Sequence, residues 1–209
     1  MEAILNFDLA VFEWIRETLW NPVLDTLVTA YTVLGEGGAI WIALGVILLI
    51  PKKTRKAGLA VLTAILIMKI FNNLVLKDPI ARPRPFNLLS DWDGIKEFPE
   101  LAKRWAEGYV YPNLVERPSS WSFPSGHTAA AFAAATGLTL ASKKIGVGIT
   151  AFAAAALMGF TRLYVHVHYC TDVIGGALAG VIYGIAGYFI AVAIYNLLAK
   201  KFPKFACAE

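Results

Sequence analysis

Charged residues are scarce in this sequence of 209 residues: they make up 16% of the chain, whereas hydrophobic residues make up 57%. A soluble globular domain usually has about 25% charged and about 45–50% apolar residues. The mean hydropathy of +0.59 agrees with this shortage of charge. The composition therefore excludes an ordinary water-soluble domain and indicates an all-α integral membrane protein, with a single membrane-embedded domain over residues 1–209.

Cysteine and targeting signals are also sparse. The two cysteines, Cys170 and Cys207, have no metal-site spacing and imply no disulfide framework. The first twenty residues lack the basic start and the small-residue cleavage site of a signal peptide, so we expect none. The net charge of +4 comes from basic residues at the ends of apolar segments, and it does not indicate nucleic-acid binding.

Five apolar segments predict membrane-spanning helices. They cover about residues 38–50, 57–76, 125–142, 145–164 and 172–198. The first is short for a helix that needs about 20 residues to cross a bilayer, and an earlier start near Val33 stays open, with the following glycines as a bend. In the fifth segment, Gly176, Gly180 and Gly184 are four residues apart, which favours close contact with a neighbouring helix.

Residues 1–35 predict two interfacial helices ahead of the bundle. Residues 3–19 form an amphipathic helix that we expect at the membrane surface, with charged residues on its polar side. Its apolar side consists of Ile4, Leu5, Leu9, Phe12 and Ile15. The break at Asn21-Pro22 precedes a second helix over about residues 23–34. A further crossing within residues 3–34 would make the bundle one of six spans.

Basic residues predict the orientation of the chain. Basic clusters follow the first, third and fifth spans, at residues 52–56, 143–144 and 200–204. Five spans place these clusters and the C-terminus on one side, which the positive-inside rule assigns to the cytoplasm. The long loop 77–122, with a short helix expected at 93–108, then lies on the outer face, together with the turn 162–172.

Unusual polar residues gather at the outer ends of the predicted spans. They are Lys77 and Arg84 in the first cluster, Ser125, Gly126 and His127 in the second, and Arg162, His168 and Asp172 in the third. Arginine and lysine bind phosphate oxygens, and the free N–H groups of a helix start attract anions. His168 and Asp172 are one helical turn apart, and a carboxylate bonded to one ring nitrogen leaves the other free to attack. The three clusters predict a site for phosphoryl transfer.

The spacing of these residues resembles the type 2 phosphatidic acid phosphatase superfamily. The patterns Lys-x6-Arg-Pro, Pro-Ser-Gly-His and Arg-x5-His-x3-Asp occur in the family's order within residues 77–172. The resemblance implies that His168 is the nucleophile and forms a phosphohistidine, that Asp172 orients it, and that His127 protonates the leaving oxygen. The phosphate would be held by Lys77, Arg84, Arg162, Ser125 and the amide of Gly126. No metal or other cofactor is implied, in agreement with the lack of a carboxylate cluster suited to magnesium.

The resemblance also implies a function. We expect a multi-pass cell-membrane enzyme, with its site on the extracytoplasmic face, that hydrolyses an isoprenoid diphosphate such as undecaprenyl diphosphate to the monophosphate and inorganic phosphate. The alternative is a phosphatidylglycerophosphate or phosphatidate phosphatase of the same superfamily. The expected partners are the lipid substrate and membrane lipids, without nucleic acid, and the oligomeric state stays open. The five spans argue against the related soluble vanadium haloperoxidases, and the complete set of two histidines and one aspartate argues against a non-catalytic lipid-binding or transport protein.

Three further residues are less clearly assigned. Arg82 is interpreted as a headgroup or surface contact, and His166 as a packing residue or secondary contact. Lys69 lies within the second span, about two helical turns before Lys77, with no acidic partner that the sequence identifies. Three interpretations stay open: a functional cation, a side chain that extends to the membrane interface, or a bond to Asn72 or Asn73 on the same face. The segment 86–122 either shapes a headgroup pocket or acts as a lid.

Overall fold

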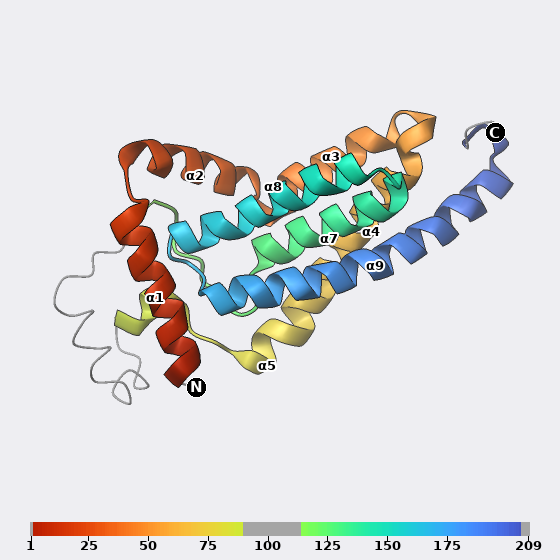
Figure 1. Cartoon of the computed structure of the whole chain (residues 1–209). Coiled ribbons are helices and arrows are strands. Elements are labelled where there is room, and N and C mark those ends of the chain that lie inside the picture. The colour runs from red at the N-terminus through yellow and green to blue at the C-terminus, as the bar shows by residue number, and fades with distance from the viewer. Residues whose placement is uncertain (1, 90–113, 206–209) are drawn as a thin grey trace.

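The computed structural model describes residues 2–89 and 114–205, and every regular element within those ranges is helical. Figure 1 shows α3 (Ala39–Leu49), α4 (Arg55–Phe71), α7 (Gly126–Ser142), α8 (Ile145–Tyr164) and α9 (Cys170–Lys201) running along one long bundle. The first helix, α1 (Glu2–Thr18), crosses one end of it, and α2 (Pro22–Leu34) leads from α1 towards α3. The prediction of an all-α bundle is confirmed.

The spans differ in detail from the sequence prediction. Among the described residues, three helical stretches are long and apolar enough to cross a membrane: Lys52–Asn87, Ile145–Tyr164 and Cys170–Lys201. A fourth is the pair Pro22–Leu34 and Glu36–Leu49, bent by 45°. The bend falls at the glycines, since Gly37 and Gly38 adopt the left-handed φ values of 58° and 79° that glycine permits. Whether the bundle has five or six spans stays a prediction.

The helix α4 continues beyond Phe71 towards the site. It runs into a π-helical turn, Asn72–Lys77, and a short helix α5, Asp78–Ile80. Ala81 then takes a left-handed φ of 44° and ends the helix. Lys77 is thereby placed on a turn of unusual geometry, of a kind that often occurs at functional sites.

The most enclosed helix is α7, whose 17 residues include many buried alanines. The glycines of α9 pack against it. A Cβ atom added at Gly176, Gly180 or Gly184 would lie 2.7, 2.6 or 2.7 Å from a backbone oxygen of α7 or of its N-cap residue. The close helix contact predicted from the glycine spacing is therefore confirmed.

The amphipathic helix α1 is present, but its apolar side packs on protein. Leu5, Leu9, Phe12 and Ile15 are buried in a cluster with residues of the turn that follows α8, including Val165, Val167 and Tyr169. Two details of the prediction were wrong. Ile4, expected on the apolar side, is 55% exposed. Asp8, expected on the polar side, is fully buried because it accepts the Thr171 N–H and pairs with Arg82.

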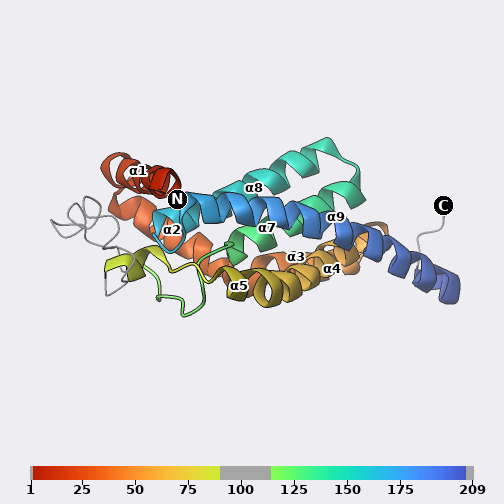
Figure 2. The same cartoon turned by 90° about the horizontal axis from the view of Figure 1, so that it is seen from below.

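The two ends of the bundle differ in character. The junctions that carry the basic residues 52–56, 143–144 and 200–204 lie at the end far from α1 (Figures 1 and 2). There Arg55 donates a hydrogen bond of 2.7 Å to the Phe205 carbonyl, and the Lys56 ammonium lies over the Tyr195 ring. The phosphate-site motifs begin at the opposite end. The helix expected at 93–108 lies outside the described residues.

Candidate active site

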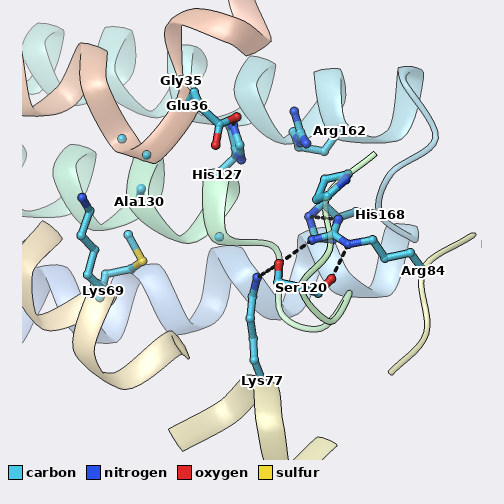
Figure 3. A pocket seen from close by; sticks show the side chains of 15 residues that line it. Gly35, Glu36, Lys69, Lys77, Arg84, Ser120, His127, Ala130, Arg162 and His168 are labelled. Carbon is cyan, nitrogen blue, oxygen red and sulfur yellow. Dashed lines mark hydrogen bonds and ion pairs between the residues drawn. The ribbon is translucent and has the colours of Figure 1, made fainter. Parts of the chain in front are cut away.

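A cavity of about 190 Å³ lies where the three motif segments meet at the α1 end of the bundle. Six of the eight predicted site residues line it: Lys77, Arg84, Gly126, His127, Arg162 and His168. Figure 3 shows Arg84, Arg162 and His168 close together on one side, with Lys77 approaching from another. Asp172 and Ser125 lie behind this lining. The convergence of the three motifs on one cavity agrees with the prediction.

Arg84 and Lys77 are positioned by Ser120, which the sequence interpretation did not identify. The Arg84 guanidinium donates from Nε to the Ser120 carbonyl at 2.6 Å and from an Nη atom to the Ser120 hydroxyl at 3.1 Å. Lys77 Nζ donates to the same hydroxyl at 3.1 Å. Arg84 also donates to the Val167 carbonyl at 2.8 Å. One serine thus holds two cations at the cavity wall (Figure 3).

Arg162 is a buried cation with an open donor. One of its Nη atoms donates to the Thr32 hydroxyl of α2 at 2.5 Å, and its Nε has no hydrogen-bond partner among the described residues. A buried guanidinium without a full set of partners is costly. Because Arg84 and Lys77 line the same cavity, a phosphate anion would satisfy the open donor and offset the repulsion between the three cations.

His168 is held with one ring nitrogen towards the cavity. Its Nδ1 lies 3.5 Å from a carboxylate oxygen of Asp172, and its Nε2 lies 3.2 Å from an Nη atom of Arg84. Since arginine only donates, Nε2 acts as the acceptor and the ring proton is assigned to Nδ1, facing Asp172. Burial lowers the pKa of His168 to about 3. The imidazole is therefore neutral at pH 7, with a lone pair on Nε2, as a nucleophile requires.

The carboxylate of Asp172 is fully buried and bonded on both oxygens. Its Oδ2 accepts the backbone N–H of Tyr169 at 3.0 Å and the hydroxyl of Ser122. Its Oδ1 accepts an Nη donor of Arg82 at 2.6 Å. Arg82 and Ser122 therefore position the group that positions His168, and the sequence interpretation assigned neither of them to the site.

Arg82 was interpreted as a headgroup or surface contact, and this was wrong. Its second Nη atom lies 2.7 Å from Asp8 Oδ2, and its guanidinium stacks 3.9 Å from the centre of the Tyr169 ring. Asp8 also accepts the backbone N–H of Thr171 at 2.8 Å and the Thr171 hydroxyl at 2.7 Å. Arg84 lines the cavity, whereas Arg82 lies behind it against the two carboxylates.

The residues of the Pro-Ser-Gly-His segment differ in their position: Gly126 and His127 line the cavity, whereas Ser125 does not. His127 Nε2 lies 3.4 Å from a carboxylate oxygen of Glu36, within ion-pair distance but without hydrogen-bond geometry. The Ser125 hydroxyl accepts the Thr128 hydroxyl at 2.9 Å and caps α7, and Ser125 is absent from the cavity lining. A phosphate contact from Ser125 stays a prediction.

His166 packs against Phe12 with ring centres 4.7 Å apart, in agreement with a packing residue.

Within residues 2–89 and 114–205, no group of three or more His, Cys, Asp or Glu side chains is arranged to hold a metal ion. One more residue of the cavity wall, Lys69, takes no part in the contacts described above.

Comparison with known proteins places these motifs in a family. Residues 56–202 match the PAP2 superfamily. The undecaprenyl-diphosphatase of Sulfolobus acidocaldarius is 32% identical over 143 residues, which are 68% of this chain and 58% of that protein. The undecaprenyl-diphosphatase BcrC of Bacillus subtilis is 30% identical over 101 residues, 44% of this chain and 51% of that protein. The chain thus spans little more than half the length of these curated relatives.

Two solved structures resemble the fold. The crystal structure of Aquifex aeolicus LpxE superposes with a TM-score of 0.59 at 30% identity, over 86% of this chain and 93% of that one. A PAP2-type phosphatidylglycerolphosphate phosphatase from Bacillus subtilis superposes with a TM-score of 0.67 at 24% identity, over 93% and 89%. At that identity the second likeness concerns the fold alone.

Proposed function

The chain belongs to the PAP2 superfamily, and on this premise we propose that it is a membrane lipid phosphatase. The proposed reaction removes the terminal phosphate of an isoprenoid diphosphate resembling undecaprenyl diphosphate, giving the monophosphate and inorganic phosphate. The observation that carries the proposal is the position of His168, whose Nε2 lies 3.2 Å from Arg84 at a cavity that Lys77, Arg84 and Arg162 also line.

In the first step, His168 Nε2 attacks the terminal phosphorus. A nitrogen–phosphorus bond forms while the bond to the leaving oxygen breaks, and His127 donates a proton to that oxygen. Positive charge that develops on the imidazole is stabilised by Asp172 through Nδ1–H. The three cations neutralise the equatorial oxygens of the transferred phosphoryl group.

In the second step, water attacks the phosphohistidine. His127, now without its proton, takes a proton from the water, the nitrogen–phosphorus bond breaks and inorganic phosphate leaves. His127 is thus the general acid of the first step and the general base of the second.

The choice of substrate rests on the relatives. Two of the curated relatives are named undecaprenyl-diphosphatases, which supports an isoprenoid diphosphate. The alternative is a phosphatidylglycerophosphate or phosphatidate phosphatase of the same superfamily. Comparing kcat/KM for these lipids in detergent, with a chelator present, decides between them.

The nucleophile is tested by phosphate release from the preferred lipid. We expect His168→Ala to lose at least about 10³-fold in kcat, as removal of a catalytic nucleophile usually does. Lys53→Ala, at the far end of the bundle, serves as the control and should keep normal turnover. Near-normal turnover of His168→Ala would show that the nucleophile is misassigned.

We also propose that the cavity faces the outside of the cell and that the basic end faces the cytoplasm. The test uses a variant in which the native cysteines are replaced by serine. Trp121→Cys, at the cavity end, should react with an impermeant thiol reagent added to intact cells, whereas Lys53→Cys should react only after the membrane is opened. The reverse labelling pattern would overturn this orientation.

A further inference from the structure

Lys69 is a cation that the proposed mechanism does not use. It stands on α4, inside the apolar stretch Lys52–Asn87 that is long enough to cross a membrane. It lines the same cavity as Lys77 and His168, yet it makes no hydrogen bond or ion pair with any residue in the described ranges. Its side chain is exposed and not enclosed by protein, and an ionisable residue within a span by default indicates a function.

Lys69 lies on the opposite side of His127 from the proposed nucleophile (Figure 3). In Figure 3, His168, Arg84 and Arg162 lie on one side of His127, and Lys69 lies on the other. In phosphoryl transfer the attacking and leaving atoms lie roughly in line across the phosphorus. If His127 protonates the leaving oxygen, the leaving group extends past His127 towards Lys69.

The turn that contains Gly35, Glu36, Gly37 and Gly38 lines the cavity together with Lys69. Gly37 is exposed, and a Cβ atom added there would meet nothing within 4 Å, so the turn is open on this side. The Glu36 carboxylate points towards His127, at 3.4 Å from Nε2. A ligand group can therefore be placed between the turn and the Lys69 ammonium.

The charge of the leaving group distinguishes substrate classes. When a lipid monophosphate is cleaved, the leaving group is an alcohol that needs only a proton. When a diphosphate is cleaved, the leaving group is a second phosphate that carries away the electron pair of the broken bond. That negative charge needs a fixed cation on the leaving side, beyond the three that surround the transferred phosphate.

We propose that Lys69 and the Gly35–Gly38 turn form a subsite for the lipid-linked phosphate of a diphosphate substrate. The inference rests on the proposed function, since it assumes phosphoryl transfer to His168. The lipid tail then continues from the Lys69 end, because Lys69 lies deeper than Lys77 in the apolar stretch Lys52–Asn87 that is long enough to cross a membrane. Lys69 is thus a specificity residue for diphosphates.

The test compares farnesyl diphosphate with farnesyl monophosphate, which share one tail. Lys69→Met should lower kcat/KM for the diphosphate by roughly tenfold or more, the usual effect of losing a charged hydrogen bond, and should change the monophosphate by less than about twofold. Lys69→Arg should keep most of the diphosphate preference. Lys53→Met is the matched control and should leave the rates for both lipids unchanged.

A second measurement does not depend on turnover. Pyrophosphate should raise the unfolding temperature of the detergent-solubilised protein more than orthophosphate does, and Lys69→Met should abolish that difference. An equal effect of Lys69→Met on both lipids, no effect on either, or an unchanged pyrophosphate shift would overturn the subsite. If the unsubstituted chain cleaves neither lipid, the proposed function fails, and the pyrophosphate shift still tests the subsite separately.

Discussion

Arg82 and Asp172 form a buried ion pair, with an Nη atom of Arg82 2.6 Å from Oδ1 of Asp172. The same guanidinium binds Asp8 of α1 at 2.7 Å. One cation therefore joins the first helix of the chain to the carboxylate behind His168. Asp172 is held from this side by Arg82 and from the other by Ser122 and the Tyr169 N–H, which limits it to one orientation.

The first prediction concerns Arg82. Arg82→Gln leaves two buried carboxylates, Asp8 and Asp172, without their cation, and breaking a buried ion pair in this way costs about 3–5 kcal/mol. We expect a correspondingly lower free energy of unfolding, measured by denaturant titration in detergent. Lys53→Gln, which removes an exposed cation at the far end of the bundle, should change it by less than about 0.5 kcal/mol. Adding Asp8→Asn to Arg82→Gln should recover part of the loss; a purely additive double variant would contradict the coupling.

The second prediction concerns Asp172. Asp172→Asn keeps the shape of the side chain but removes the charge that stabilises an imidazolium and selects the Nδ1–H tautomer. By analogy with orienting aspartates in other nucleophilic sites, kcat should fall by about 10²–10⁴-fold with little change in KM. Steady-state phosphate release measures both constants. A rise in KM with unchanged kcat would show that Asp172 only shapes the binding site.

The third prediction concerns pH. Burial lowers the pKa of His168 to about 3, below the value of about 6.5 in the unfolded chain. Between these two values the unfolded chain binds more protons than the folded one, so this residue makes stability fall as the pH drops below about 6.5. NMR of ring-labelled histidine should show a neutral His168 at pH 5, assigned by comparison with His168→Gln. A protonated His168 at that pH would contradict the burial argument.

The fourth prediction concerns the contact between α7 and α9. Gly180→Ala places a methyl group 2.6 Å from the Ala129 carbonyl oxygen, and overpacking of this kind costs about 1–3 kcal/mol. The same substitution at Gly146, whose Cβ would meet nothing within 4 Å, should be neutral or stabilising because alanine favours the helix. Thermal unfolding of the two variants tests the contrast. Equal melting temperatures would show that the helices can separate without cost.

The sequence predicted the helices and the convergence of the three motifs because both depend on local patterns. Apolar segments predicted the helices, and glycines four residues apart predicted a close helix contact. The spacing of the motifs placed Lys77, His127 and His168 at helix ends. Asp8 and Arg82 could not be predicted in this way. They lie 74 residues apart, and only the docking of α1 on the turn after α8 brings them together.

The loop serine Ser120 eluded prediction for a related reason. A serine beside a proline-rich loop has no periodic pattern, and its contacts with Lys77 and Arg84 span 43 and 36 residues. Hydrogen-bond partners of this kind follow from the path of an irregular segment, which hydrophobic patterning does not encode.

The Ser125 N–H donates to the Asp172 carbonyl at 3.1 Å and so links the start of α7 to the start of α9. The two backbones can approach this closely because Gly176 has no Cβ atom. This contact fixes the spacing between His127 and the carboxylate that orients His168. Arg84 is bonded to the Val167 carbonyl and to His168, whereas Lys77 stands apart on a π-helical turn. Substitutions around that turn can therefore reshape one wall of the cavity while the two histidines and Asp172 keep their places.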